Sequence, residues 1–203
     1  MAELITATTI SELILTRMCH DIAGISGTVS NAVELLEDGD LDFLEDITSN
    51  LKTSSAVMNA RIKFFRLAFG MNNANLSDTA LVFKTATDYL STIGGRNYNI
   101  SLQMNNIPQE LTKIALTGIM IVADTLIKGG IINVEYQNGK LLISSQSPAP
   151  AKDKIIATVS CLDGSSLQFT AQFAPIFYLK ELLKYSNYNL ILKADECLSL
   201  LVQ

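Results

Sequence analysis

The stretch Leu15-Thr-Arg-Met-Cys-His-Asp-Ile-Ala-Gly-Ile25 begins the pattern that decides the fold of this chain. From its first residue, apolar side chains recur at alternating spacings of three and four, at positions 15, 18, 22, 25, 29, 32 and 36. A seam with a repeat of about 3.5 residues is typical of a long helix that packs along its length against other helices. We therefore expect one helix from about Thr9 or Ser11 to Leu36.

The same stretch holds His20, the only histidine among the 203 residues, followed directly by Asp21. Histidine ionises near neutral pH, so it can act as a nucleophile, an acid or a metal ligand. His20 lies two residues from Met18 and two from Ile22, which at about 100° per residue places it roughly 200° from either. The spacing predicts a histidine on the outside of the helix; a core histidine or a merely solvated one is the alternative.

Two other uses of His20 are disfavoured by spacing. Adjacent helical residues point about 100° apart, so Cys19 and His20 are not expected to form a nucleophile–base pair. The other cysteines, Cys161 and Cys197, are far away and give no CxxC or HxxxH spacing. We therefore expect no metal bound by this chain.

The composition narrows the class of protein. The chain is 48% hydrophobic and 17% charged with a net charge of -5, which fits a globular protein and disfavours nucleic-acid binding. Three cysteines fit a reducing cytoplasm better than a disulfide framework. The N-terminus does not resemble a signal peptide. The apolar run from Ile114 to Ile127 is too short, and too interrupted by Asp124 and two threonines, to cross a membrane.

A second helical pattern runs from Leu41 to Phe69, after a turn at residues 37–40, and Gly70 is expected to cap it. A polar linker follows at residues 72–75. Two long helices joined by a short loop form an antiparallel hairpin. Such a hairpin cannot cover its own apolar seam, so we expect it to dimerise into a four-helix bundle or to pack on the rest of the chain.

The second half of the chain combines helical and strand patterns. The Asn138-Gly139 pair predicts a tight hairpin turn, and the segment 155–162 is ambiguous between strand and short helix. Helices are expected at residues 78–93, 109–128 and 173–185, strands at 100–104, 131–136, 140–145, 189–193 and 197–202, and a loop at 147–154. This order predicts an α+β sandwich with helices on one face of a mixed sheet.

Three motifs resemble the ChpT-type histidine phosphotransferases, and more broadly the histidine kinase core. They are Arg17-Met-Cys-His-Asp21, Asn31-Ala-Val-Glu-Leu-Leu36 and Phe65-Arg-Leu-Ala-Phe-Gly70. The resemblance implies a dimerising phosphotransfer hairpin at residues 1–72 and a degenerate ATPase-like α/β sandwich at residues 76–203. The two hairpins of a homodimer would then form a four-helix bundle.

This resemblance implies a phosphorelay function. A phosphoryl group would move from the aspartate of one receiver domain to His20, and then to the aspartate of another receiver. The magnesium ion would come with the receiver. A divergent histidine kinase, and a non-catalytic dimeric adaptor that only binds receivers, are the alternative functions.

The nucleotide motifs of a kinase are missing. A kinase needs paired asparagines on the helix that corresponds to residues 109–128, where this chain has Gly118 and Val122 at about the expected places. It also needs glycine-rich loops, and Gly164 is the only glycine between Leu141 and Gln172. We therefore expect no ATP binding.

The resemblance also suggests roles for single residues around His20. Asp21 can accept a hydrogen bond from the second ring nitrogen, unless it is simply a solvated acid. Arg17 lies on the same helical face and either steadies phosphoryl oxygens or pairs with Glu12 or another acid. The small or exposed residues expected to meet a receiver are Thr16, Cys19, Ala23 and Gly24.

Two further segments leave alternatives. Kinases carry proline five residues after the histidine, where this chain has Ile25; Gly24 and Gly27 would loosen the helix instead, by roughly 1 kcal/mol each. At the end of the second helix, residues 61–66 are basic and aromatic. We expect them to pack on the second domain, in preference to contacting a partner.

Overall fold

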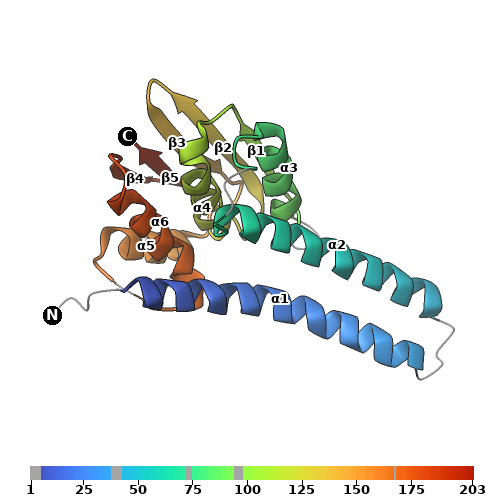
Figure 1. Cartoon of the computed structure of the whole chain (residues 1–203). Coiled ribbons are helices and arrows are strands. Elements are labelled where there is room, and N and C mark those ends of the chain that lie inside the picture. The colour runs from blue at the N-terminus through green and yellow to red at the C-terminus, as the bar shows by residue number, and fades with distance from the viewer. Residues whose placement is uncertain (1–5, 38–42, 72–74, 94–97, 167) are drawn as a thin grey trace.

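The computed structural model of this chain describes residues 6–37, 43–71, 75–93, 98–166 and 168–203. Its helices α1 (Ala7–Glu37) and α2 (Leu44–Ala68) form an antiparallel hairpin whose far half extends beyond the rest of the chain (Figure 1). The long first helix is confirmed, and it continues through the glycines at positions 24 and 27. Most of the expected turn at 37–40 and linker at 72–75 lies outside the described residues.

The apolar seam of α1 is only partly covered within one chain. Ile25 and Ala32 are buried, whereas Leu15 is 61% exposed and Leu36 is also exposed. Near the start of α1 the buried side chains are Ile10 and Ile14, which join the same core as the sandwich. One copy of the hairpin therefore leaves part of its seam open to solvent.

Helix α2 ends two residues earlier than Gly70, the expected cap. The Gly70 N–H donates to the Arg66 carbonyl at 3.2 Å. A Cβ atom on Gly70 would collide with that same carbonyl oxygen. Glycine is required here because the backbone approaches the end of α2 closely.

A five-stranded mixed sheet forms the second half of the chain, in the order β1-β2-β3-β5-β4. Strand β1 is parallel to β2, and the other neighbours are antiparallel. The β2–β3 turn is at Asn138 and Gly139, whose φ angles are 52° and 78°, as a type I′ turn requires. The strands are β1 (Ile100–Met104), β2 (Gly130–Gln137), β3 (Lys140–Gln146), β4 (Leu190–Ala194) and β5 (Leu198–Val202).

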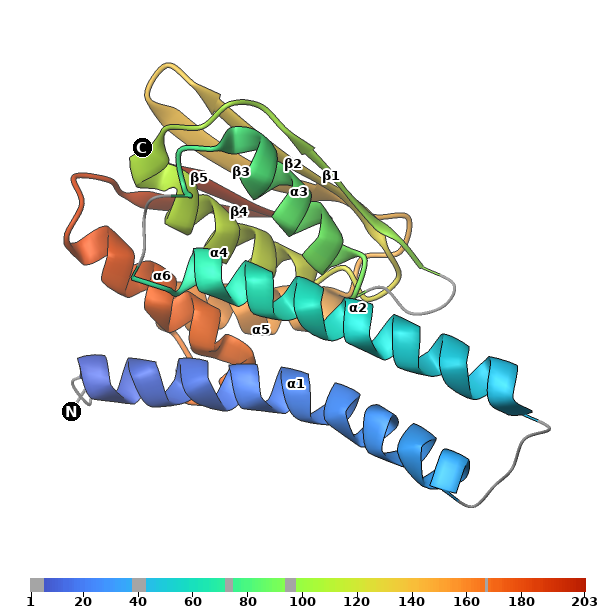
Figure 2. The same ribbon diagram turned by 45° about the vertical axis from the view of Figure 1, so that its right-hand side comes forward.

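Buried and more exposed residues alternate along β1, β3 and β5, so one face of the sheet is covered and the other faces solvent. Helices α3, α4 and α6 lie on the covered face, which is turned toward the hairpin (Figures 1 and 2). These helices are α3 (Thr79–Leu90), α4 (Thr112–Ala123, preceded by a 3₁₀ turn at Gln109–Leu111) and α6 (Ala174–Lys184, preceded by a 3₁₀ turn at Ala171–Phe173). The predicted α+β class, a helical hairpin followed by a sandwich, is confirmed.

The ambiguous segment is helical. Helix α5 spans Lys152–Asp163, so its first turn occupies the end of the predicted 147–154 loop. Ile155, Thr158 and Leu162 are buried on one side, and Ile156 is 64% exposed. Gly164 ends the helix in the left-handed conformation, with φ 87°, as helix ends commonly do.

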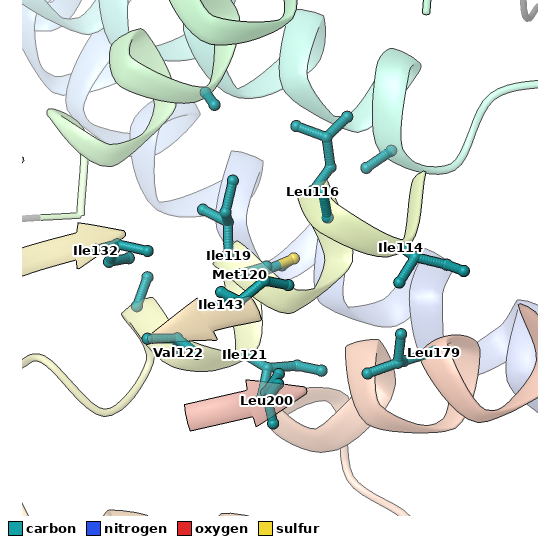
Figure 3. Close-up of a cluster of buried hydrophobic side chains, with 14 of the residues drawn as sticks. Ile114, Leu116, Ile119, Met120, Ile121, Val122, Ile132, Ile143, Leu179 and Leu200 are labelled. Carbon is teal, nitrogen blue, oxygen red and sulfur yellow. The ribbon is translucent and has the colours of Figure 1, made fainter. Parts of the chain in front are cut away.

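Helix α4 is the centre of the core. Eleven of its twelve residues are buried, because it lies between the sheet and the helices α2 and α6 (Figure 2). Figure 3 shows its side chains meeting those of β2, β3, β5 and α6: Ile132, Ile143, Leu200 and Leu179. The α4 residues labelled there are Ile114, Leu116, Ile119, Met120, Ile121 and Val122.

The core extends into the end of the hairpin. Phe64 on α2 stacks on Tyr89 of α3 with ring centroids 3.8 Å apart and 11° between the planes. Phe65 contacts both rings edge-on, and all three are almost completely buried. The expected packing of this aromatic segment on the second domain is confirmed, and it fixes the hairpin against the sandwich.

Candidate functional site

His20 lies on α1 with its side chain 82% exposed. Its neighbours on the core side, Met18 and Ile22, are partly buried. The prediction from the 3.5-residue seam is therefore confirmed: the imidazole points away from the core. An exposed imidazole of this kind can be reached by another macromolecule.

Asp21 sits against His20 but is much less exposed. Its carboxylate is 14% exposed, and its Oδ1 atom lies 3.4 Å from His20 Nδ1. This distance is longer than that of a typical N–H···O hydrogen bond. Since Nδ1 faces Asp21, Nε2 is the imidazole nitrogen that is directed away from this carboxylate.

Arg17 occupies the position one turn before Asp21 and turns toward the core. Its Nε donates to Asp21 Oδ2 at 2.9 Å. Its Nη1 and Nη2 donate to the two carboxylate oxygens of Asp124 at 3.1 and 3.0 Å, and Nη1 also reaches the Gln172 carbonyl at 3.3 Å. Arg17 thus pairs with two acids, Asp21 on its own helix and Asp124 in the sandwich. Whether Arg17 also contacts phosphoryl oxygens stays a prediction.

Arg61 holds the other side of Asp21. Its Nη1 donates to the Asp21 backbone carbonyl at 2.6 Å, and its Nε and Nη2 bond the Thr92 hydroxyl and carbonyl at 3.2 and 3.1 Å. Thr92 follows α3 in the sandwich. Two arginines, one on each helix of the hairpin, therefore connect the Asp21 turn to the second domain.

Burial and charge act against each other in this cluster. Burial lowers the pKa of Arg17, but the charges and hydrogen bonds of Asp124 and Asp21 outweigh it and raise this pKa above its usual value. Burial raises the pKa of Asp124, and Arg17 opposes that shift. Burial also raises the pKa of Tyr89, with a further contribution from Asp124, so the phenol stays neutral at physiological pH.

The residues expected to meet a receiver surround His20 on the open face. Thr16, Cys19, Ala23 and Gly24 are all exposed, and a Cβ atom on Gly24 would meet nothing within 4 Å. On the side toward α2 lies an open hollow of about 500 Å³. It is lined by His20, Asp21, Gly24, Ile25, Thr28, Thr53, Ser54, Val57 and Arg61.

Gly118 and Val122, which the resemblance is expected to match with the kinase asparagines, are tightly packed. Val122 is fully buried. Gly118 is buried too, and a Cβ atom there would collide with the Ile143 Cδ1 atom and lie 3.5 Å from the Leu200 Cδ1 atom. Side chains of β3 and β5 therefore fill the space beside α4.

Other kinds of site find little support in the described part of the chain. No group of three or more metal-binding side chains occurs among the described residues. No helix among them combines the length and hydropathy needed for a membrane crossing. The three cysteines are free thiols, with Cys19 exposed and Cys161 buried.

Sequence reasoning missed Asp124 and the bonds of Arg61. Asp124 was visible only as an acid that interrupts an apolar run. An acid in such a run is rarely buried without a partner, so it indicates a buried ion pair, but nothing in the sequence points to Arg17, 107 positions earlier. Arg61 offers no comparable signal, because basic residues on exposed helical faces are common.

Comparison with known proteins supports the fold and the motif resemblance. No family model matches the chain. The protein phosphotransferase ChpT of Brucella abortus (strain 2308) is 30% identical over 139 residues, which cover 66% of this chain and 63% of that protein. The match thus spans less than two thirds of the relative's length.

One of two solved structures shares the architecture of this chain. The structure of a bacterial phosphotransferase superposes with a TM-score of 0.77 at 22% identity, over 99% of this chain and 98% of the other. A histidine kinase from Burkholderia phymatum STM815 aligns over 97% of both chains, with a TM-score of 0.37 and 10% identity. The first of these establishes a shared fold; the second is too distant to do so.

Proposed function

We propose that this protein is a histidine phosphotransferase of a bacterial two-component phosphorelay. His20 accepts a phosphoryl group from a receiver-domain aspartate and passes it to the aspartate of another receiver. The observation that carries this proposal is the exposed His20 imidazole beside an Asp21 carboxylate that Arg17 holds in place. The similarity to a protein phosphotransferase supports it.

The chemistry requires little beyond the imidazole. The Nε2–P bond forms as the O–P bond of the aspartyl phosphate breaks, and the electron pair returns to the receiver's carboxylate. The Nδ1 proton stays in place, hydrogen-bonded to Asp21, whose charge offsets the developing imidazolium. The second transfer reverses these steps. Positioning and charge neutralisation dominate phosphoryl transfer, and the receiver supplies the magnesium ion.

We also propose that the phosphoryl group does not come from ATP. The two positions of α4 where kinase asparagines would lie are Gly118 and Val122, and both are buried under apolar side chains. The segment between Leu141 and Gln172, where the resemblance would require glycine-rich loops, holds Gly164 as its only glycine, and that glycine ends helix α5.

We also propose that the protein works in the cytoplasm, because its three cysteines are free thiols and a reducing compartment keeps thiols in that state.

The test uses a panel of purified receiver domains, each charged from radiolabelled acetyl phosphate and then mixed with this protein. We expect label to reach the wild-type chain from at least one receiver and not from labelled ATP. Label from ATP alone would establish a kinase. A receiver that binds without ever transferring label would establish an adaptor.

We further propose that two copies pair through their hairpins to form a four-helix bundle. The exposed apolar residues of the hairpin, which include Leu15, Val33, Leu36, Phe43 and Leu44, support this, because exposed apolar patches mark contact surfaces. Light scattering should give twice the 22.1 kDa mass of one chain.

Leu15→Glu should convert this dimer to a monomer, because a buried unpaired carboxylate opposes association. The matched control is Ile156→Glu on α5, where the apolar side chain is 64% exposed compared with 61% for Leu15. The control should remain a dimer. A wild-type monomer would contradict the bundle.

A further inference from the structure

We propose that Asp124, a residue of the sandwich, is a positioning residue for His20: it holds Arg17 so that Asp21 keeps one carboxylate oxygen free for the imidazole. This inference rests on the phosphotransfer function proposed above. It gives the second domain a part in the chemistry of a hairpin residue.

The geometry has a specific consequence for Asp21. Asp124 takes both Nη groups of Arg17, at 3.1 and 3.0 Å, which leaves only Nε to reach Asp21 Oδ2. Arginine otherwise binds a carboxylate through two parallel N–H···O bonds. Without Asp124, Arg17 could engage both oxygens of Asp21. With it, Oδ1 remains directed at His20 Nδ1.

The network is rigid because it is buried and balanced. The side chains of Arg17 and Asp21 are each 14% exposed and that of Asp124 is 19% exposed, next to an imidazole in open solvent. Arg17 bonds both carboxylates, Arg61 donates to the Asp21 backbone carbonyl, and Lys154 also acts on Asp124. Buried charges are stable only when they are paired and hydrogen-bonded, so the guanidinium has little freedom to turn.

The expected effect is on the tautomer of His20. The nitrogen that carries the proton in a neutral imidazole is set by the hydrogen bond that its partner nitrogen makes. Asp21 Oδ1 favours the proton on Nδ1, which leaves the Nε2 lone pair free to attack phosphorus. If Arg17 takes both oxygens of Asp21, this preference is lost.

The test is Asp124→Asn, which keeps the size of the side chain but removes its charge and one of its two acceptors. The chain has one histidine, so NMR of the imidazole nitrogens gives one set of signals. We expect the Nδ1–H form to dominate in the wild type and to decline in the variant. Phosphoryl transfer should slow about 10- to 100-fold, the range seen when the partners that orient metal-bound histidines are lost, with receiver affinity unchanged.

A matched control shows whether Asp124 positions His20 or only attaches the hairpin to the sandwich. Thr92→Val removes the hydroxyl that accepts from Arg61 Nε, which weakens another bond between hairpin and sandwich and leaves the Arg17 fork untouched. It should change neither tautomer nor rate. If Thr92→Val and Asp124→Asn have equal effects, Asp124 only fastens the domains, and an unchanged tautomer in Asp124→Asn overturns the proposal.

A second variant keeps the proposal testable if the Asp124→Asn protein does not fold. Arg17→Lys keeps the charge but loses the planar fork, so it cannot take both oxygens of Asp21 and should leave the Nδ1–H form dominant; a decline of that form in Arg17→Lys would overturn the proposal. The tautomer is measured without any receiver. If wild-type protein takes no label, the phosphotransfer function fails, while the tautomer result still decides whether Asp124 positions His20.

Discussion

Replacing His20 by glutamine is expected to abolish all transfer of label from phosphorylated receivers to this protein. No other histidine exists in the chain, and glutamine has no lone pair of comparable basicity to attack phosphorus. The stability of the fold should be nearly unchanged, because the side chain is 82% exposed. Within the part of the chain that the structure describes, its side chain makes one polar contact, the 3.4 Å approach to Asp21. Surface changes of this kind shift stability by less than about 0.5 kcal/mol.

The measurement is a time course of label in wild type and variant, with thermal unfolding of both. Glu34→Gln is a suitable control, because Glu34 is also exposed on α1 and lies about four turns away. It should transfer like wild type. Label on the His20→Gln protein would mean that another residue is the acceptor, whereas equal losses in both variants would point to damaged receiver binding.

Local pattern was enough to predict the hairpin and the outward direction of His20. A helix with a repeat of 3.5 residues has one apolar side, so a residue out of phase with that side must face away. The Asn138-Gly139 turn was equally predictable, because both residues must adopt positive φ and few residue pairs do so readily. In these places the local sequence preference and the tertiary structure agree.

Helix α5 shows where local pattern fails. Residues 155–162 contain several β-branched side chains, which favour strands, and the run is too short for its period to decide. Packing decides instead: Ile155, Thr158 and Leu162 are buried at helical spacings. Propensity is a weak preference that tertiary contacts override.

The candidate site shows the same limit on a larger scale. Proximity in the sequence placed Arg17 and Asp21 beside His20, and it left the partner of Arg17 open between Glu12, another acid and a phosphoryl group. The fork to Asp124 joins residues 107 positions apart. Periodicity carries no information on such a pairing, because it depends on how the sandwich docks on the hairpin through Phe64 and Tyr89.

Gly118→Asn, which places a kinase-like residue on α4, is expected to destabilise the fold by about 2–6 kcal/mol and to create no ATP site. A Cβ atom at this position would already collide with Ile143 Cδ1, and overpacking a core costs about 1–3 kcal/mol. The amide would also be buried among the apolar side chains shown around α4 in Figure 3, which adds about 1–3 kcal/mol. Chemical denaturation and a nucleotide titration measure the two effects.

Two companion variants locate the cause. Gly118→Ala adds only the Cβ atom, so its overpacking is partly offset by the better helix propensity of alanine, about 1 kcal/mol. Ile143→Val removes the colliding Cδ1 atom, and the double variant should therefore be more stable than the sum of the single changes predicts. If strict additivity held, Ile143 would not fill the space beside Gly118.

A stable Gly118→Asn protein that binds ATP would show that the nucleotide site is intact apart from one residue. Loss of stability without binding would mean instead that β3 and β5 side chains have closed it, which supports the proposal that phosphate reaches His20 from receivers.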